Sequence, residues 1–536
     1  MSASSRAPGV THDKAVRLLV VIASFGSRNR DLLRRVIHRY QQMPFAVDIV
    51  VVSEAPKDLG PGVRVVVGLP SSNPWSLPFV HKRVFQQNRD RYDLFAYSED
   101  DIEITEENIR AFLDLTPTLA HDEIAGFLRY EVDRVGARSL PDVHGAFHWK
   151  PSSVRVRGPH VVAEFTNEHA AFYLLTRQQL TTAIASGGFL REPYSGKYDM
   201  LCTAATDPYT SCGFRKVVCV SSLPRFLIHH LSNRYAGAVG QSEREFAVQI
   251  GALMQIARGE RSTAQLLDGI TLNPVDDAGL DYYEKANATL LGFVPDSATE
   301  VLCIASGRGN LEHKLLQSGR RVTALPLDAI IGAHLESAGA SVVHGNFLDS
   351  VRQLAGRHFD CVILPALLNV VSCPGEIVLT CSKLLRPGGI FLLYGPNHER
   401  APARLARLRR SRALQAQPAV SQPLGLSQLR RLLAAGGVRP ERIIWQDSLE
   451  HLPVSGAITS SRSPRRLAFA AWRRFRAALL RIDFALRFTS SEPLACHGGI
   501  GRLVSKTWIL RARKPVALVG RAALASLARR EPTAAL

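Results

Sequence analysis

YDLFAYSEDDIEIT, residues Tyr92 to Thr105, is the stretch that decides the fold of the first half of the chain. Its apolar part, Leu94 to Tyr97, is typical of a buried strand, and three consecutive acids follow: Glu99, Asp100 and Asp101. Adjacent carboxylates repel one another unless a cation lies between them. Mg²⁺ and Mn²⁺ bind carboxylates and bridge them to substrate phosphates. The stretch therefore predicts a divalent-metal site at a strand end.

A second interpretation of these acids is the beginning of a helix. Glu103, Glu106 and Glu107 lead into the helical pattern IRAFLDL. Acidic residues are favourable at the N-terminal end of a helix dipole. Both interpretations stay open on the sequence alone.

The segments before this stretch indicate an α/β sheet. Continuous apolar runs at 17–25, 47–52 and 63–67 predict strands, and helical spacing appears at 32–43 and 79–92. This order is typical of a sheet wound like a nucleotide-binding domain, which binds ligands at the carboxyl ends of its strands. The acids lie at such an end, and so do the residues after the first strand, Ser24, Phe25 and Gly26.

The opening strand with its small-residue loop, together with SEDDIEI, resembles the GT-A glycosyltransferases. The resemblance implies a nucleoside diphosphate sugar bound through Mn²⁺ or Mg²⁺. It implies donor binding by Ser24, Phe25, Gly26, Glu99 and Asp100, and metal binding by Asp101 and Glu99.

The later segment LIHHLSN supplies a histidine where that family often has one more metal ligand. His229 and His230 are adjacent, so on a strand they point to opposite sides and only one can reach the metal. We predict His230 as the ligand, with His229 as the alternative.

A catalytic base is also expected if the sugar is transferred with inversion, since a carboxylate must then deprotonate the acceptor hydroxyl. The acids available after the metal motif are Glu164, Glu168, Glu192, Asp199 and Asp207. Asp199 and Asp207 lie in a segment rich in tyrosine, and we predict one of them as the base. For each acid, the competing interpretation is a helix cap or a turn residue.

A second pattern begins at Glu300 with EVLCIASGRGNLEHKLLQSGRRVTALPLD, which is strand, glycine turn, helix and strand. FDCVIL, GNFLDS and LLRPGG follow, and YYEKAN precedes it. The set resembles class I S-adenosylmethionine-dependent methyltransferases from about Asp281 to Pro515. The resemblance implies cofactor binding by a set of five residues: Ala305, Gly307, Gly309, Asp328 and Asp349.

The sequence departs from that family at three positions. Ala305 stands where the family prefers glycine, and Pro326 stands where an acid usually binds the ribose hydroxyls. Asn369 and Val370 stand where many relatives have Glu-His. We predict that Asp328, two residues further on, takes the place of this acid in binding the ribose hydroxyls. These departures leave two alternatives, a working methyltransferase and a catalytically silent one.

The net charge of +19 is concentrated late in the chain. Residues 400–487 contain eighteen Arg, no Lys and four acids. Within them, 464–488 has an apolar helical face with Trp and Phe, which predicts peripheral contact with an anionic membrane surface. The alternative is a helix packed on the methyltransferase-like domain with solvated arginines. No recognition motif supports nucleic-acid binding.

Composition and cysteine usage bound the class of protein. The chain has 536 residues, and no apolar run approaches the roughly 20 needed to span a bilayer. Its eight cysteines are scattered singly, which favours reduced thiols in the cytoplasm, with the inner membrane face as the site of the predicted peripheral contact.

Together these patterns predict an α/β protein with two Rossmann-like domains. The predicted parts are a disordered N-terminus at 1–16, a GT-A-like domain at 17–262, a linker at 263–280, a methyltransferase-like domain at 281–515 with a basic insertion at 400–488, and a loose tail at 516–536. The first functional hypothesis is a bifunctional enzyme of polysaccharide biosynthesis, which transfers a sugar to a glycan or glycolipid acceptor and methylates a hydroxyl. The alternatives are a glycosyltransferase with a silent methyltransferase-like scaffold, and a methyltransferase with a sugar-recognition module.

Overall fold

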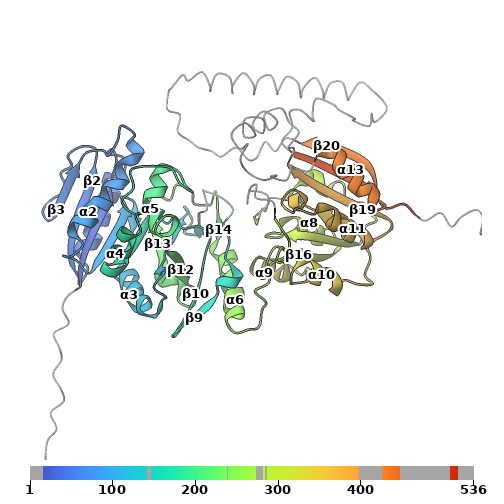
Figure 1. Ribbon diagram of the computed structural model, residues 1–536, viewed down its shortest axis with the longest axis horizontal. Helices are drawn as coiled ribbons and strands as arrows, with labels where there is room; N and C mark the ends of the chain where they lie inside the picture. Colours follow the sequence, from blue (N-terminus) through green and yellow to red (C-terminus); the bar gives the residue numbers. More distant parts are fainter. Residues whose placement is uncertain are drawn as a thin grey trace, which may run out of the picture. The chain divides into compact units, whose positions relative to one another are not determined.

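The computed structural model describes residues 16–141, 147–237, 239–272, 282–283, 286–396, 425–446 and 507–516. The chain divides into two compact units, Met1–Thr263 and Ala264–Leu536, called unit 1 and unit 2 below. In Figure 1 the elements of unit 1 run from blue to green and those of unit 2 from yellow to red.

Unit 1 is organised around a five-stranded sheet with the order β11-β4-β1-β2-β3. The strands are β1 (Arg17–Ala23), β2 (Ala46–Ser53), β3 (Val63–Val67), β4 (Leu94–Glu99) and β11 (Phe172–Thr176). The first four are parallel, as their continuous apolar runs predict, and β11 is antiparallel to β4. Ala23 pairs with Glu99, so the loop after β1 and the acidic residues after β4 lie at the same edge.

Two smaller sheets complete unit 1, with the orders β14-β8-β7-β13-β5 and β6-β12-β10-β9. Their strands are β5 (Ile102–Glu103), β6 (Glu123–Ala125), β7 (Leu128–Val132), β8 (Arg138–Leu140), β9 (Arg155–Arg157), β10 (His160–Ala163), β12 (Arg215–Cys219), β13 (Leu227–His230) and β14 (Gln241–Ser242). β13 pairs with β5 so that His230 lies opposite Ile102. This pairing brings the predicted histidine beside the acidic stretch.

The helices of unit 1 are α1 (Arg30–Gln41), α2 (Val80–Asn88), α3 (Glu106–Leu115), α4 (Arg177–Ala185), α5 (Met200–Thr210) and α6 (Glu243–Ala257). Thr105 caps α3 in a capping box, and Glu106 and Glu107 occupy its first turn. The helix-start interpretation is therefore correct for these two acids. Glu99, Asp100 and Asp101 lie before the helix, at the end of β4.

Unit 2 contains one seven-stranded sheet with the order β17-β16-β15-β18-β19-β21-β20. The strands are β15 (Glu300–Ser306), β16 (Arg321–Pro326), β17 (Ser341–Val342), β18 (Phe359–Leu364), β19 (Leu385–Pro396), β20 (Arg439–Gln446) and β21 (Thr507–Arg513). Strands β15 to β19 pair in parallel, and β21 is antiparallel to both of its neighbours. The order reverses at β15, which makes its carboxyl end the expected ligand site.

The sheet of unit 2 is buried on both faces. Alternate residues of one strand belong to different cores: Leu302 and Ile304 to one, Val301 and Cys303 to the other. The helices are α7 (Ala288–Leu291), α8 (Asn310–Gln317), α9 (Ala329–Ser337), α10 (Phe347–Gln353), α11 (Pro374–Lys383) and α13 (Leu426–Ala435). Figure 1 shows helices on both sides of the sheet, as in a doubly wound α/β fold.

Two predicted boundaries need correction. Residues 264–272, assigned to the linker, belong to unit 2, where Leu266 is fully buried in the core. Residues 425–446, assigned to the basic insertion, form α13 and the strand β20, which pairs with β21. The predicted membrane contact at 464–488 lies outside the described residues. Among the described helices, none combines the length and apolar character that a membrane span requires.

Candidate functional sites

The three acids after β4 have different partners. The Asn29 amide donates to Asp100 at 2.8 Å, and burial raises the pKa of Asp100 to about 6. Asp101 lies 3.1 Å from His230, which holds its pKa below the usual range despite burial. The partner of Glu99 is a different residue: its Oε1 atom lies 3.8 Å from the Nε2 atom of His169. Burial and the charge of Asp101 raise the pKa of Glu99 to about 8.

His230 lies between two carboxylates. Its Nε2 atom faces Asp101, and its Nδ1 atom bonds to the fully buried Glu131 of β7. Burial alone would lower the pKa of His230, but these two hydrogen bonds raise it to about 9. A histidine oriented by a carboxylate through its second nitrogen is typical of metal ligands. His229 points the other way and stacks on Tyr130, as the strand alternation predicts.

The metal prediction fits this geometry only in part. Asp101 and His230 are close enough to share an ion, but within the described residues no hydrogen bond or ion pair joins Glu99 to either of them. In the part of the chain that the structure describes, no group of three or more His, Cys, Asp or Glu side chains is arranged to hold a metal ion. Magnesium is often held by one or two protein carboxylates, with substrate phosphates and water completing its shell. The protein alone therefore offers a two-residue site rather than a complete cage.

The predicted donor loop lies beside the acids. Ser24 is buried and accepts a hydrogen bond from Lys57 at 3.0 Å, while Phe25 is 52% exposed. Gly26 has φ +69°, which favours glycine, and its N–H donates to Glu54. The loop thus presents an exposed aromatic ring at the ligand edge of the sheet.

The two predicted bases occupy structural positions. Asp207 is fully buried, forms an ion pair with Lys82, and accepts hydrogen bonds from Tyr194 and Ser211. Asp199 is the N-cap of α5 and accepts from the Cys202 N–H. The prediction of Asp207 is wrong because its carboxylate is sealed from any acceptor, and Asp199 matches the cap interpretation instead.

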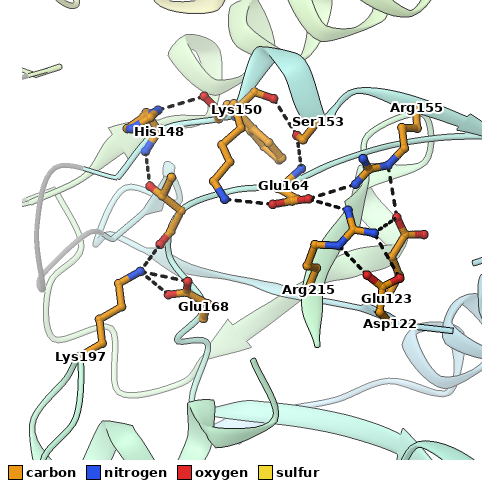
Figure 2. Close-up of polar contacts among 12 residues, drawn as sticks. Asp122, Glu123, His148, Lys150, Ser153, Arg155, Glu164, Glu168, Lys197 and Arg215 are labelled. Carbon is orange, nitrogen blue, oxygen red and sulfur yellow. Dashed lines mark hydrogen bonds and ion pairs between the residues drawn. The ribbon is translucent and has the colours of Figure 1, made fainter. Parts of the chain in front are cut away.

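The other acids considered as bases are bound in ion pairs. Figure 2 shows Glu164 with Lys150, Arg155 and Arg215, and Glu168 with Lys197. Glu192 pairs with Arg83 at the surface. Each of these carboxylates forms an ion pair with a cationic side chain, which indicates a structural role. The structure therefore supports none of them as the base.

In unit 2 the glycine turn follows the central strand β15, at the carboxyl edge of the sheet. Ala305 has φ +54° and Gly309 has φ +91°, both left-handed. A Cβ atom at Gly309 would lie 2.5 Å from the Cδ2 atom of Leu335 of α9, so a larger residue would force that side chain to move in addition to straining the backbone. The turn leads into α8, and the N-terminus of a helix offers N–H groups that lack intrahelical acceptors. The turn lies where the cofactor loop is predicted, and cofactor binding by its residues stays a prediction.

The two predicted acidic contacts lie in different surroundings. Asp328 is 2% exposed, caps α9 through the Ile330 and Ile331 N–H groups, and interacts with Tyr282. Asp349 lies in the first turn of α10, where it is exposed and pairs with Arg352. The structure does not support Asp328 as a cofactor contact, because the helix cap occupies its buried carboxylate. The contact by Asp349 stays a prediction, because its carboxylate is exposed. The position at the end of β16 is Pro326, which is buried and whose side chain has no acceptor for a ribose diol.

Residues 265–272 run along the same carboxyl edge. The Leu266 N–H donates to the Leu327 carbonyl, the Phe347 N–H donates to the Leu266 carbonyl, and the Ser372 N–H donates to the Thr271 carbonyl. This segment therefore joins the loops after β16, β17 and β18. Arg308 also donates its N–H to the Tyr282 carbonyl, which fixes the glycine turn from the same side.

Sequence reasoning missed three buried charged residues near these sites. Arg129 and Glu131 lie on β7, and Glu312 lies on α8 with its Oε2 atom buried and without a hydrogen-bond partner among the described residues. The signal for the first two was the strand LRYEV, in which two charged residues alternate with apolar or aromatic ones. In a buried strand this alternation indicates charges that face an interior polar site.

Comparison with known proteins finds that part of this chain is similar to methyltransferases. A ubiquinone biosynthesis O-methyltransferase from Xanthomonas campestris pv. campestris (strain B100) is 34% identical over 140 residues, covering 25% of this chain and 54% of that protein. The same-named protein of Xylella fastidiosa (strain 9a5c) is 31% identical over 140 residues, covering 25% of this chain and 53% of that protein. The chain thus spans about half the length of these curated relatives.

Among solved structures, a SAM-dependent methyltransferase from Archaeoglobus fulgidus is 15% identical, with a TM-score of 0.27, covering 41% of this chain and 87% of that one. No protein-family model matches the chain. The relatives agree with the sheet of unit 2, which has the class I methyltransferase-like fold. The curated relatives named here give no evidence for a glycosyltransferase half, and sugar transfer by unit 1 stays a prediction.

Proposed function

We propose that the protein is an S-adenosylmethionine-dependent O-methyltransferase, with the cofactor bound by unit 2 and with unit 1 recognising a sugar. The observation that carries this proposal is the left-handed turn Ala305–Gly309 at the reversal point of a class I methyltransferase-like sheet. The O-methyltransferase names of the curated relatives support the reaction class. When bound, the cofactor supplies an electrophilic methyl group.

The residues of this chain hold such a cofactor through the backbone rather than through an acid. The turn and the N-terminus of α8 offer N–H donors, whereas the end of β16 offers no carboxylate to the ribose hydroxyls. A hydrogen bond to a charged group contributes about 1.5–3 kcal/mol, so its loss weakens binding roughly 10- to 100-fold. We therefore expect weak, saturable cofactor binding.

Methyl transfer is tested with the full-length protein, S-adenosylmethionine and a panel of quinols, phenols and glycans. Formation of S-adenosylhomocysteine that depends on the acceptor supports the proposal. A folded protein that binds the cofactor but turns over no acceptor favours the silent scaffold instead.

A second function is favoured by a separate observation in unit 1, the placement of His230 between Asp101 and Glu131. We propose that Asp101 and His230 hold Mn²⁺ or Mg²⁺ and that the ion binds the diphosphate of a nucleoside diphosphate sugar. Such an ion would neutralise the leaving phosphate if the sugar is transferred to a glycan or glycolipid. Metal-dependent hydrolysis of a nucleoside diphosphate sugar, lost in Asp101→Asn, tests transfer. Metal-dependent binding without hydrolysis leaves unit 1 as a recognition module.

Two further expectations from the sequence remain proposals. They are a cytoplasmic location and a peripheral membrane contact through 464–488. Flotation of the full-length protein with vesicles of anionic and neutral lipid tests the second.

A further inference from the structure

A segment at the start of unit 2 lies on the edge of the sheet where a ligand is expected. This segment, residues 265–272, is called the strap below. Its two ends form isolated β-bridges, Gln265 with Asp328 and Leu272 with Val371. The bridge partners lie in the loops after β16 and β18, and β15 lies between these two strands in the sheet. The strap therefore joins the two loops that flank the carboxyl end of β15.

Backbone hydrogen bonds hold the strap at both ends. The Leu266 N–H donates to the Leu327 carbonyl at 2.9 Å, and the Leu266 carbonyl accepts from the Phe347 N–H at 2.8 Å. At the other end, the Thr271 carbonyl accepts from the Ser372 N–H at 2.9 Å. Three loops of the carboxyl edge thus use backbone donors or acceptors on the strap.

Apolar side chains anchor the strap as well. Leu266 is fully buried in the core that also contains Leu327 and Phe347. Leu267 and Ile270 pack against the same core and are partly buried. The strap is therefore packed into the edge of unit 2 as part of its core, and its release exposes apolar surface.

The backbone groups that bind the strap are neighbours of the predicted cofactor contacts. Leu327 directly precedes Asp328, and Phe347 lies two residues before Asp349. A backbone N–H has a single hydrogen to donate. A ligand that bonds to the Phe347 N–H therefore has to displace the carbonyl of Leu266, and the strap competes with any cofactor that reaches this part of the edge.

We propose that the strap is autoinhibitory: it occupies the part of the carboxyl edge where the nucleoside end of S-adenosylmethionine binds, and the cofactor binds after the strap is released. The inference rests on the proposed methyltransferase function and adds a regulation of the same site. The apparent dissociation constant equals the intrinsic one divided by the fraction of molecules whose strap is open. A strap that is open in about 1% of molecules weakens binding about 100-fold.

Hydrogen–deuterium exchange of the full-length protein, measured by mass spectrometry with and without S-adenosylmethionine, tests the release. Amides of 265–272 are expected to exchange about tenfold or more faster with the cofactor bound, because the strap leaves its partners. Amides of 305–311, in the glycine turn and the start of α8, are expected to exchange more slowly. Faster exchange in one segment with slower exchange in the other is the signature of displacement.

Two variants loosen the strap in different ways. Asp268 is exposed, and its carboxylate accepts from the Gln265 N–H at 2.8 Å, so Asp268→Ala weakens the turn of the strap without changing the core. Leu266→Ala removes the buried anchor. Both variants are expected to bind S-adenosylmethionine more tightly than wild-type protein in isothermal titration calorimetry, Leu266→Ala by about tenfold or more.

Matched controls change similar residues away from the strap. Leu290→Ala removes a buried leucine from the core on the other face of the sheet, and Asp296→Ala removes an exposed acid. Neither control is expected to bind the cofactor more tightly. If Leu266→Ala fails to fold, Asp268→Ala alone carries the comparison.

Two results overturn the inference and leave the methyltransferase proposal standing. In the first, wild-type protein binds S-adenosylmethionine while exchange in 265–272 stays the same or slows. In the second, the strap variants that fold bind the cofactor no more tightly than wild-type protein and the controls. If wild-type protein and the strap variants all fail to bind at millimolar cofactor although unit 2 is folded, the methyltransferase proposal itself fails, and the inference fails with it.

Discussion

The Nε2 atom of His230 lies 3.1 Å from the Oδ2 atom of Asp101, while Glu131 holds the other nitrogen of the ring. The two residues come from strands far apart in the sequence, β13 and the end of β4, and the short strand β5 brings them together. If this pair holds a metal ion, Glu131 controls the orientation of the ring.

Glu131→Gln tests that role. We expect the affinity for Mn²⁺, measured calorimetrically in the presence of a nucleoside diphosphate, to fall roughly 10- to 100-fold, because the ring loses its charged orienting partner. Glu107→Gln, an exposed acid on α3, is the control and should leave the affinity unchanged. An unchanged affinity in Glu131→Gln would argue against His230 as a ligand.

Pro326→Asp is expected to strengthen cofactor binding by unit 2. An aspartate at the end of β16 would restore a charged acceptor for the ribose hydroxyls, which corresponds to roughly 10- to 100-fold tighter binding. Pro326→Asn is the matched comparison, since it loses the same proline packing without adding a charge. Equal affinities of the two variants for S-adenosylmethionine would show that the ribose does not lie at this position.

Ala305→Gly is expected to stabilise unit 2. Ala305 has φ +54°, and a left-handed conformation costs a residue with a Cβ atom about 1–2 kcal/mol. Glycine avoids this cost, but its greater conformational entropy in the unfolded chain offsets part of the gain in stability. A rise of about 1–3 °C in the melting temperature by calorimetry is the expected result. Gly319→Ala makes the reverse change at φ +80°, with nothing within 4 Å of the added Cβ, and should lower it. A fall in Ala305→Gly would mean that the methyl group packs favourably.

Asp207→Ala is expected to destabilise unit 1 rather than to remove a base. It leaves Lys82 buried without its partner, which costs about 3–5 kcal/mol. The double variant Lys82→Met/Asp207→Leu removes both charges and should recover most of that loss. Thermal unfolding measures both variants. A single variant that unfolds like wild-type protein but loses sugar transfer would restore Asp207 as a catalytic candidate.

The pH dependence of unit 2 stability is expected to contain a contribution from Asp328. Burial raises its pKa to about 6, so the folded protein binds this proton more tightly than the unfolded chain. Stability from this group is therefore largest below about pH 4, falls as the pH rises from about 4 to 6, and is constant above that range. Asp328→Asn keeps the cap and should lack this fall when melting temperatures are compared between pH 4 and 7. A similar fall in the melting temperature of Asp328→Asn between pH 4 and 7 would show that another titrating group causes the pH dependence.

The buried parallel strands were predictable from the sequence because they are continuous apolar runs, as in VDIVVV and FDCVIL. The short strands of the two smaller sheets of unit 1 were not predicted. The glycine turn after β15 was predictable for a related reason, since backbone conformation there restricts the residue type. The alternation at His229 and His230 predicted that only one ring reaches Asp101, and the structure shows that this ring is His230.

Carboxylates were harder to assign. Asp199, Asp207, Asp328 and Asp349 are equally suited to catalysis and to capping or ion pairing, and only the fold decides between these roles. Arg129 and Glu131 escaped notice because their importance depends on strands β13 and β4, which lie far away in the sequence. Long-range contacts of this kind leave only a weak local pattern.

Equilibrium binding of S-adenosylmethionine to the full-length protein, measured by isothermal titration calorimetry, tests the central proposal most directly. We expect saturable binding with one site per chain, weakened by Pro326 but tightened in Pro326→Asp. Absence of binding at millimolar cofactor, by a protein whose unit 2 is folded, would contradict methyltransferase function and leave the turn Ala305–Gly309 as a structural feature.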